Sequence, residues 1–105
     1  MTARHLAVDL GAESGRALLG ELHDDGRLSV EPVHRFATRI QTVGGHLFWD
    51  WDLLLSGLGQ ALLAAARSPR PPTTVGIDSW GVDFGLLDAA GVLLDRPQCY
   101  RDPDG

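Results

Sequence analysis

The sequence predicts an α/β fold, a mixed sheet in β-β-β-α-β order with extra hairpin strands after the last strand. Three observations support this prediction. Two short apolar runs, residues 6–8 and 75–77, each end next to an aspartate. A stretch with helical periodicity, residues 54–65, lies between them. Short turn signals join the first three apolar runs, as in an antiparallel meander.

The first three strands are expected at residues 6–10, 16–22 and 28–36. A glycine- and serine-containing turn separates the first two, and an Asp-Asp-Gly hairpin signal separates the second and third. Pro32 lacks a backbone N–H, so we expect the third strand to be bent or bulged there. Residues 37–46 are polar and contain glycine, which predicts a loop.

The helix is expected to begin after Asp50, a good N-cap residue, with Trp49 packing on Leu54 as a hydrophobic staple. Trp49 and the following Trp51 are interpreted as helix-start packing rather than ligand contacts. Gly57 and Gly59 lie in this helix, and each lowers helix stability by roughly 1 kcal/mol relative to alanine, so tertiary packing must support the helix. A proline-rich segment, residues 68–72, is expected to end it.

A fourth strand is expected at residues 73–78, followed by hairpin strands at 82–88 and 92–94 around an Ala-Ala-Gly tip. A helix between the third and fourth strands predicts a crossover that makes the fourth strand parallel to a neighbour. Asp9 and Asp78 would then lie at carboxyl ends of strands, where open α/β sheets bind ligands.

Composition excludes several function classes. The 105 residues suit one domain and carry a net charge of −5. All nine basic residues are arginine, so a Walker A loop, which needs lysine, is excluded, and an acidic chain is not expected to bind nucleic acid. No apolar run approaches membrane-spanning length, and no signal peptide is expected. The single cysteine, Cys99, can form no disulfide within the chain, which fits a cytoplasmic location.

The turn after the first strand predicts a phosphate-binding site. Glycines allow close backbone approach, successive N–H groups form an anion nest, and an aspartate can hold Mg²⁺ directly or through water. The candidate residues for binding a nucleotide phosphate are Asp9, Gly11, Ala12, Glu13, Ser14, Gly15 and Arg16. The alternative is an ordinary hairpin turn with a capping aspartate.

Four motifs in order resemble the FGGY carbohydrate kinases, which have the ribonuclease H-like fold of the actin-like ATPases. They are residues 8–16, 34–36 with 49–50, 76–84 with 86–88, and 100–102. Within the family, the motifs are most similar to those of kinases that act on L-rhamnulose. The resemblance implies an enzyme that transfers the γ-phosphoryl group of ATP to the 1-hydroxyl of this ketose, with Mg²⁺.

The resemblance also implies roles for individual residues. Asp9 would organise Mg²⁺, and Gly81 would approach the sugar through its backbone. Trp80 is a candidate platform for a sugar face, with core packing as the alternative. Asp83 is a candidate substrate residue, or else a partner of Arg101. For Asp78, the alternative to a substrate contact is hydrogen bonding to loop amides.

Two departures from the family and the length of the chain limit what it is expected to do. Glu13 stands where the family often has a small residue, and its charge would repel phosphate unless it points away. The match fades at Asp104 and Gly105. Residues 1–105 are expected to be the N-terminal part of the kinase's N-terminal domain, lacking the C-terminal domain, the catalytic base and the adenine site. The chain alone is therefore expected to be inactive.

Three other functions stay open at this point. The kinase could act on another ketose or a polyol. The chain could belong to a non-enzymatic actin-like module that binds nucleotide. It could also be a truncated domain without a function of its own. No Cys/His cluster with metal-ligand spacing is present in the sequence.

Overall fold

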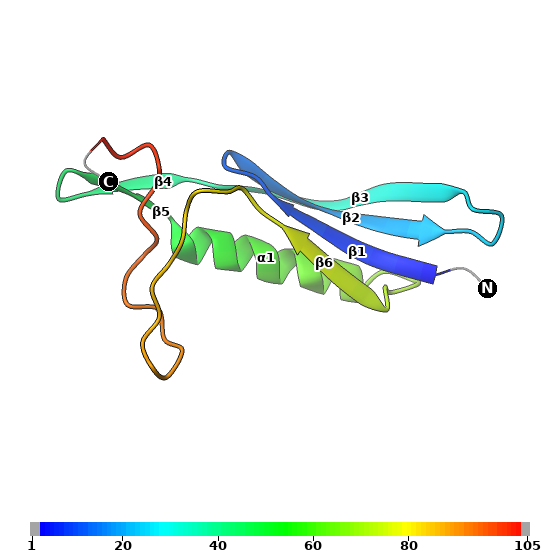
Figure 1. Ribbon diagram of the computed structural model, residues 1–105. Coiled ribbons are helices and arrows are strands. Elements are labelled where there is room, and N and C mark those ends of the chain that lie inside the picture. Colours follow the sequence, from blue (N-terminus) through cyan, green and yellow to red (C-terminus); the bar gives the residue numbers. More distant parts are fainter. Residues whose placement is uncertain (1–2, 104–105) are drawn as a thin grey trace.

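A four-stranded mixed sheet, covered on one face by a helix, forms the body of the computed structural model, which describes residues 3–103 (Figure 1). The strand order is β3-β2-β1-β6, and a separate two-stranded hairpin is formed by β4 and β5. The elements are β1 Ala3–Leu10, β2 Ser14–Leu22, β3 Leu28–Ala37, β4 Ile40–Val43, β5 His46–Trp49, α1 Trp51–Ala66 and β6 Thr74–Asp78. The predicted α/β fold class is confirmed.

The first three strands form the predicted antiparallel meander. In the pairing of β2 with β3, Ala17 lies opposite His34 and Leu18 lies opposite Pro32, so Val33 is an extra residue. This bulge confirms the expected irregularity near Pro32. A proline cannot donate a hydrogen bond to the ladder, and a shift in register removes that requirement.

Strand β6 pairs with β1 in parallel, as the crossover through α1 predicts. The pairing runs from His5 opposite Thr74 to Asp9 opposite Asp78. The two aspartates therefore lie side by side at the carboxyl ends of adjacent strands, and the prediction of their location is confirmed.

Helix α1 begins as the sequence predicts. The Asp50 carboxylate accepts a hydrogen bond from the Leu53 backbone N–H at 3.0 Å, which satisfies one of the free donors of the first turn. The core between helix and sheet consists of Leu6, Val8, Ala17, Leu19, Ala61 and Ala65. Its alanines allow the helix to lie close to the strands.

The two helix glycines differ in their surroundings. A Cβ atom on Gly57 would lie 2.2 Å from the ring of Phe36, and a Cβ atom on Gly15 would also lie 2.2 Å from that ring. Nothing lies within 4 Å of the corresponding position at Gly59. Phe36 thus fills the space between β2 and α1 that the absence of two side chains provides, which is the tertiary support expected for this helix.

Two segments differ from the prediction. The expected loop at residues 37–46 contains strand β4 and the start of β5, joined by Gly44 and Gly45, whose φ angles are +59° and +81°. Two such residues form the tight turn of a hairpin. The strands expected at residues 82–88 and 92–94 are reduced to one bridge, between Leu87 and Leu93, because the rest of this segment finds no ladder partner within residues 3–103.

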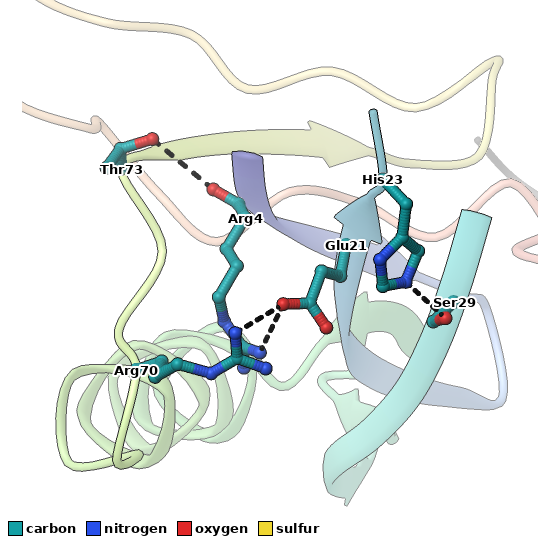
Figure 2. Close-up of polar contacts among 6 residues, drawn as sticks. All are labelled: Arg4, Glu21, His23, Ser29, Arg70 and Thr73. Carbon is teal, nitrogen blue, oxygen red and sulfur yellow. Dashed lines mark hydrogen bonds and ion pairs between the residues drawn. The ribbon is translucent and has the colours of Figure 1, made fainter. Parts of the chain in front are cut away.

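The end of the sheet where β1 begins is held by ion pairs (Figure 2). Oε1 of Glu21 lies 3.5 Å from Arg4 Nη1 and 2.7 Å from Arg70 Nη1. The side chains of Arg4 and Glu21 are largely buried. The backbone N–H of Thr73 also donates to the carbonyl of Arg4 at 3.0 Å. These contacts attach the segment between α1 and β6 to the first two strands.

Candidate functional site

The turn between β1 and β2 closes through a hydrogen bond of 3.1 Å from the Gly11 N–H to the Ser14 carbonyl. A Cβ atom on Gly11 would lie 2.5 Å from that carbonyl oxygen, so the turn itself requires glycine at this position. Glu13 is exposed, and its carbonyl accepts a hydrogen bond from the Thr38 N–H at 3.2 Å. The backbone thus fixes this turn from both sides.

Asp9 and Arg16, opposite one another in the ladder of β1 and β2, form an ion pair at the edge of the turn. Arg16 Nε donates to Asp9 Oδ2 at 3.2 Å, and both side chains are 52% exposed. An ion pair with this much exposure contributes little to stability, so both groups are available to a ligand. Asp9 and Arg16 therefore offer a carboxylate and a guanidinium side by side.

The residues at this edge fit Mg²⁺ of the kind that nucleotides carry. Within residues 3–103, no cluster of three or more His, Cys, Asp or Glu side chains is arranged to hold a metal ion. Mg²⁺ in phosphoryl-transfer sites uses one or two protein carboxylates, with waters and substrate phosphates supplying the other ligands. Asp9 and the neighbouring Asp78 match that smaller requirement. The Ser79 N–H donates a hydrogen bond to Asp78 Oδ1 at 2.9 Å, which is the hydrogen bonding to a loop amide predicted as the alternative for this residue. The other oxygen of Asp78, Oδ2, is available to a ligand.

A cavity of about 510 Å³ adjoins the same edge. Leu10, the residue after Asp9, lies in its wall, and so do Ser79 and Trp80, which follow β6. The rest of the wall is mostly apolar and comes from the end of β5, the first half of α1 and the segment after β6. It includes Trp49, Trp51, Leu54, Leu58, Phe84 and Leu93. The cavity therefore connects the strand end that carries Asp9 with the loop that carries Trp80.

Asp83 binds two tryptophans in this wall. Its Oδ2 accepts hydrogen bonds from Trp49 Nε1 at 2.7 Å and from Trp80 Nε1 at 2.6 Å. The two indole rings are 4.6 Å apart between centroids and tilted by 55°. The predicted alternative of a pair between Asp83 and Arg101 is wrong, because the carboxylate faces the indoles and Arg101 donates to the Tyr100 hydroxyl.

Gly81 is exposed, and a Cβ atom there would meet nothing within 4 Å. The chain's own packing therefore gives no reason for glycine at this position. Its predicted backbone approach to a sugar stays a prediction. Trp80 is half-buried, so its ring is neither core nor fully free.

Sequence reasoning missed how much of the site depends on Trp49, which is 2% exposed and lies in the cavity wall. Its position just before the N-cap was a signal for packing, but its hydrogen bond to a residue 34 positions away had no local signal. The anchoring role of Asp102 was also missed. Its buried carboxylate accepts from the Leu47 N–H at 2.9 Å and from Gln98 Nε2 at 2.8 Å, which ties the C-terminal segment to β5.

The Tyr100-Arg101-Asp102 motif lies beside the hairpin of β4 and β5 (Figure 1). Tyr100 lines a second cavity, of about 430 Å³, together with Asp83. The pKa of Arg101 is raised above its ordinary value, first by its hydrogen bond with Tyr100 and to a lesser degree by the charge of Glu13. Arg101 therefore stays a cation, and the Glu13 carboxylate lies near enough to contribute to its field.

No helix within residues 3–103 has the length and apolar character needed to cross a membrane.

No protein-family model matches the chain. Curated relatives do. The chain is 43% identical over 103 residues to a rhamnulokinase of Bacteroides thetaiotaomicron, covering 98% of this chain and 21% of the relative. It is 42% identical over 98 residues to a rhamnulokinase of Bacillus subtilis, covering 93% of this chain and 20% of the relative. The chain thus spans about one fifth of the length of these relatives.

Solved structures with the same fold are sugar kinases. A gluconate kinase from Lactobacillus acidophilus superposes with a TM-score of 0.68 at 13% identity, covering 93% of this chain and 20% of that one. A xylulose kinase from Rhodospirillum rubrum has a TM-score of 0.60 at 22% identity, covering 94% of this chain and 21% of that one. By sequence the chain is similar to the rhamnulokinases, and its fold is that of sugar kinases with the actin-like ATPase fold.

Proposed function

We propose that the full-length protein containing this chain is a cytoplasmic, ATP-dependent kinase of rhamnose metabolism that phosphorylates L-rhamnulose at O1. The observation that carries the proposal is the shared edge of β1 and β6. Asp9 and Asp78 lie opposite one another there, and one cavity joins that edge to the loop of Trp80. Phosphoryl transfer needs a charged site and an acceptor pocket in contact, because catalysis depends on positioning and electrostatic stabilisation.

The nucleotide side of the site is assigned to the turn and its ion pair. The N–H groups of residues 11–15 would face the phosphates of ATP, with the Ser14 hydroxyl as a further donor. Asp9 would hold Mg²⁺ directly or through water, and Mg²⁺ would neutralise charge on the β- and γ-phosphates. Arg16, released from Asp9, would bind a phosphate oxygen.

The acceptor side is assigned to the cavity wall. L-rhamnulose is a 6-deoxyketose, so it has a methyl group at C6 and an apolar C–H face. Trp80 offers an aromatic surface for such a face, and the neighbouring wall is mostly apolar. The exposed backbone at Gly81 is free to approach the sugar hydroxyls.

The remaining parts of the enzyme are assigned to the rest of the full-length protein. Residues 1–105 would form the first part of the N-terminal domain of the kinase. The catalytic base and the adenine site would lie in segments outside this chain, which covers about a fifth of its relatives. The 105 residues alone should therefore transfer no phosphate.

The proposal is tested by measuring ADP release from the full-length protein with ATP, Mg²⁺ and a panel of acceptors. The panel holds L-rhamnulose, L-fructose (the same ketose with a hydroxyl at C6), D-xylulose and glycerol. We expect kcat/KM for L-rhamnulose to exceed that for L-fructose by about tenfold or more, since an added polar group must be buried in an apolar pocket. Turnover of L-rhamnulose no faster than of water or D-xylulose would refute the substrate assignment.

A further inference from the structure

One carboxylate oxygen accounts for both indole N–H groups of the cavity wall. Asp83 Oδ2 accepts from Trp49 Nε1 at 2.7 Å and from Trp80 Nε1 at 2.6 Å. An indole has one N–H and no other polar atom. Because both indole N–H groups donate to Asp83, Trp49 and Trp80 present only carbon surfaces to a ligand.

The three residues come from two parts of the fold that are distant in sequence. Trp49 ends β5 and is buried, while Trp80 and Asp83 lie in the loop that follows β6. The hydrogen bond to Trp49 therefore fixes the loop against the beginning of α1. Without it, nothing in the ladder of β1 and β6 would determine the orientation of Trp80, because β6 ends at Asp78.

The backbone next to Asp83 is strained. Val82 has a φ of +70°, within residues 3–103 the sole non-glycine residue with a positive φ. For a β-branched side chain this is an outlier, and such strain persists only where surrounding contacts determine the conformation. The turn directs the Asp83 carboxylate back toward Trp80, three residues earlier, and the two charge-assisted hydrogen bonds supply the stabilising contact.

We propose that Asp83 is a positioning residue, which clamps Trp80 to Trp49 and so presents a fixed apolar wall to the acceptor sugar. This inference rests on the proposed kinase function. It also changes the role predicted for Asp83 from a direct substrate contact to an indirect one, since Oδ2 of its carboxylate is already occupied by two indole donors.

The clamp has a spectroscopic signature that does not depend on catalysis. Two indoles with centroids 4.6 Å apart couple excitonically and give a pair of bands of opposite sign in far-ultraviolet circular dichroism. In the full-length protein, W80F should abolish this signal and W51F should leave it, because Trp51 has no ring contact of this kind among the described residues. D83A should reduce it strongly. D83N should retain most of it, because the amide oxygen of Asn can accept both hydrogen bonds.

The kinetic test compares D83A and D83N with the wild type. We expect D83A to raise KM for L-rhamnulose about tenfold or more while KM for ATP stays within about twofold, because only the acceptor wall is displaced. In D83N, KM for L-rhamnulose should stay close to the wild-type value. The control is D95N, which removes a carboxylate that bonds the neighbouring Arg96 N–H and should leave both constants unchanged.

The outcomes separate the clamp from the kinase assignment. An unaltered circular dichroism signal in D83A, or equal changes in KM for sugar and ATP, would overturn the positioning role. If D83A fails to fold, the same measurements of circular dichroism and of KM for sugar and ATP are made on D83N and W80F, which change the protein less. A wild-type protein that phosphorylates no acceptor would overturn the proposed function instead, and the dichroism of D83A and D83N would still decide whether Asp83 holds the indoles together.

Discussion

The two ends of the sheet use charge in opposite ways. At the end where β1 and β6 finish, Asp9 and Arg16 are half exposed, and Asp78 lies beside them. At the other end, Glu21 is largely buried and bound by Arg4 and Arg70 (Figure 2). The same residue types therefore stabilise the fold at one end and stay available to a ligand at the other.

The two ends also differ in what supports them. The turn that follows β1 is held by its backbone hydrogen bonds and by apolar packing, because Phe36 lies against both Gly15 and Gly57. The opposite end depends on ion pairs and on the backbone hydrogen bond from Thr73 to Arg4. A site can keep its charged groups free for a substrate when uncharged contacts hold its backbone. This difference can be tested one residue at a time.

The largest effect is expected from Asp9→Ala in the full-length protein. Loss of the carboxylate that we propose to hold Mg²⁺ should lower kcat by about 100- to 1000-fold, the range typical of removing one preorganised electrostatic group. Stability should change by less than about 1 kcal/mol, because the pair with Arg16 is half exposed. ADP release and thermal unfolding measure the two effects. Glu21→Gln is the matched change at the other end and should leave kcat unaltered; equal losses of activity would contradict the comparison.

Gly57→Ala should give the next largest effect. Its new methyl group would meet the Phe36 ring, and overpacking of this kind costs about 1–3 kcal/mol. Because Phe36 also contacts Gly15, the turn between β1 and β2, which we propose to bind the phosphates, should move, and KM for ATP should rise. The control is Gly59→Ala, which has open space and should stabilise the helix by roughly 1 kcal/mol. Chemical denaturation measures the change in the free energy of unfolding for both variants. A change of the same sign in Gly57→Ala and Gly59→Ala would refute the role of Phe36.

The smallest effect is expected from Glu21→Gln on stability. Neutralising a largely buried carboxylate leaves Arg4 without its ion pair, which should cost about 1 kcal/mol. The exposed pair of Asp25 and Arg27 provides the control, and Asp25→Asn should change stability by less than about 0.5 kcal/mol. Chemical denaturation at low and high salt measures both. A larger loss of stability in Asp25→Asn than in Glu21→Gln would show that burial does not determine how much these ion pairs contribute to stability.

Local signals predicted the parts of this fold that depend on local chemistry. Asp50 as N-cap, the bulge near Pro32 and the parallel position of β6 all follow from turn chemistry or crossover geometry. The hairpin of β4 and β5 was missed because its polar residues suggested a loop. Its Gly-Gly turn, flanked by alternating residues, was the signal that could have found it.

Long-range pairing explains what the sequence could not predict. The apolar segment at residues 82–94 has the composition of strands, but strands need ladder partners, and one bridge forms among the described residues. For the site, sequence reasoning placed Asp9 and Asp78 at one edge of the sheet. It could not find the partner of Asp83, because Trp49 lies 34 positions away and competing partners such as Arg101 were equally plausible in sequence.

At the end of the sheet where β1 begins, Arg4 and Arg70 both bind the same oxygen, Oε1 of Glu21, and this sharing makes the junction redundant. Either guanidinium can neutralise the carboxylate when the other is replaced. Single substitutions of Arg4 or Arg70 should therefore be tolerated better than their sum suggests, and the double substitution should show a loss greater than additive. Mutational drift at one of these two positions is buffered by the other, so the junction between helix and final strand can vary in sequence without losing its attachment.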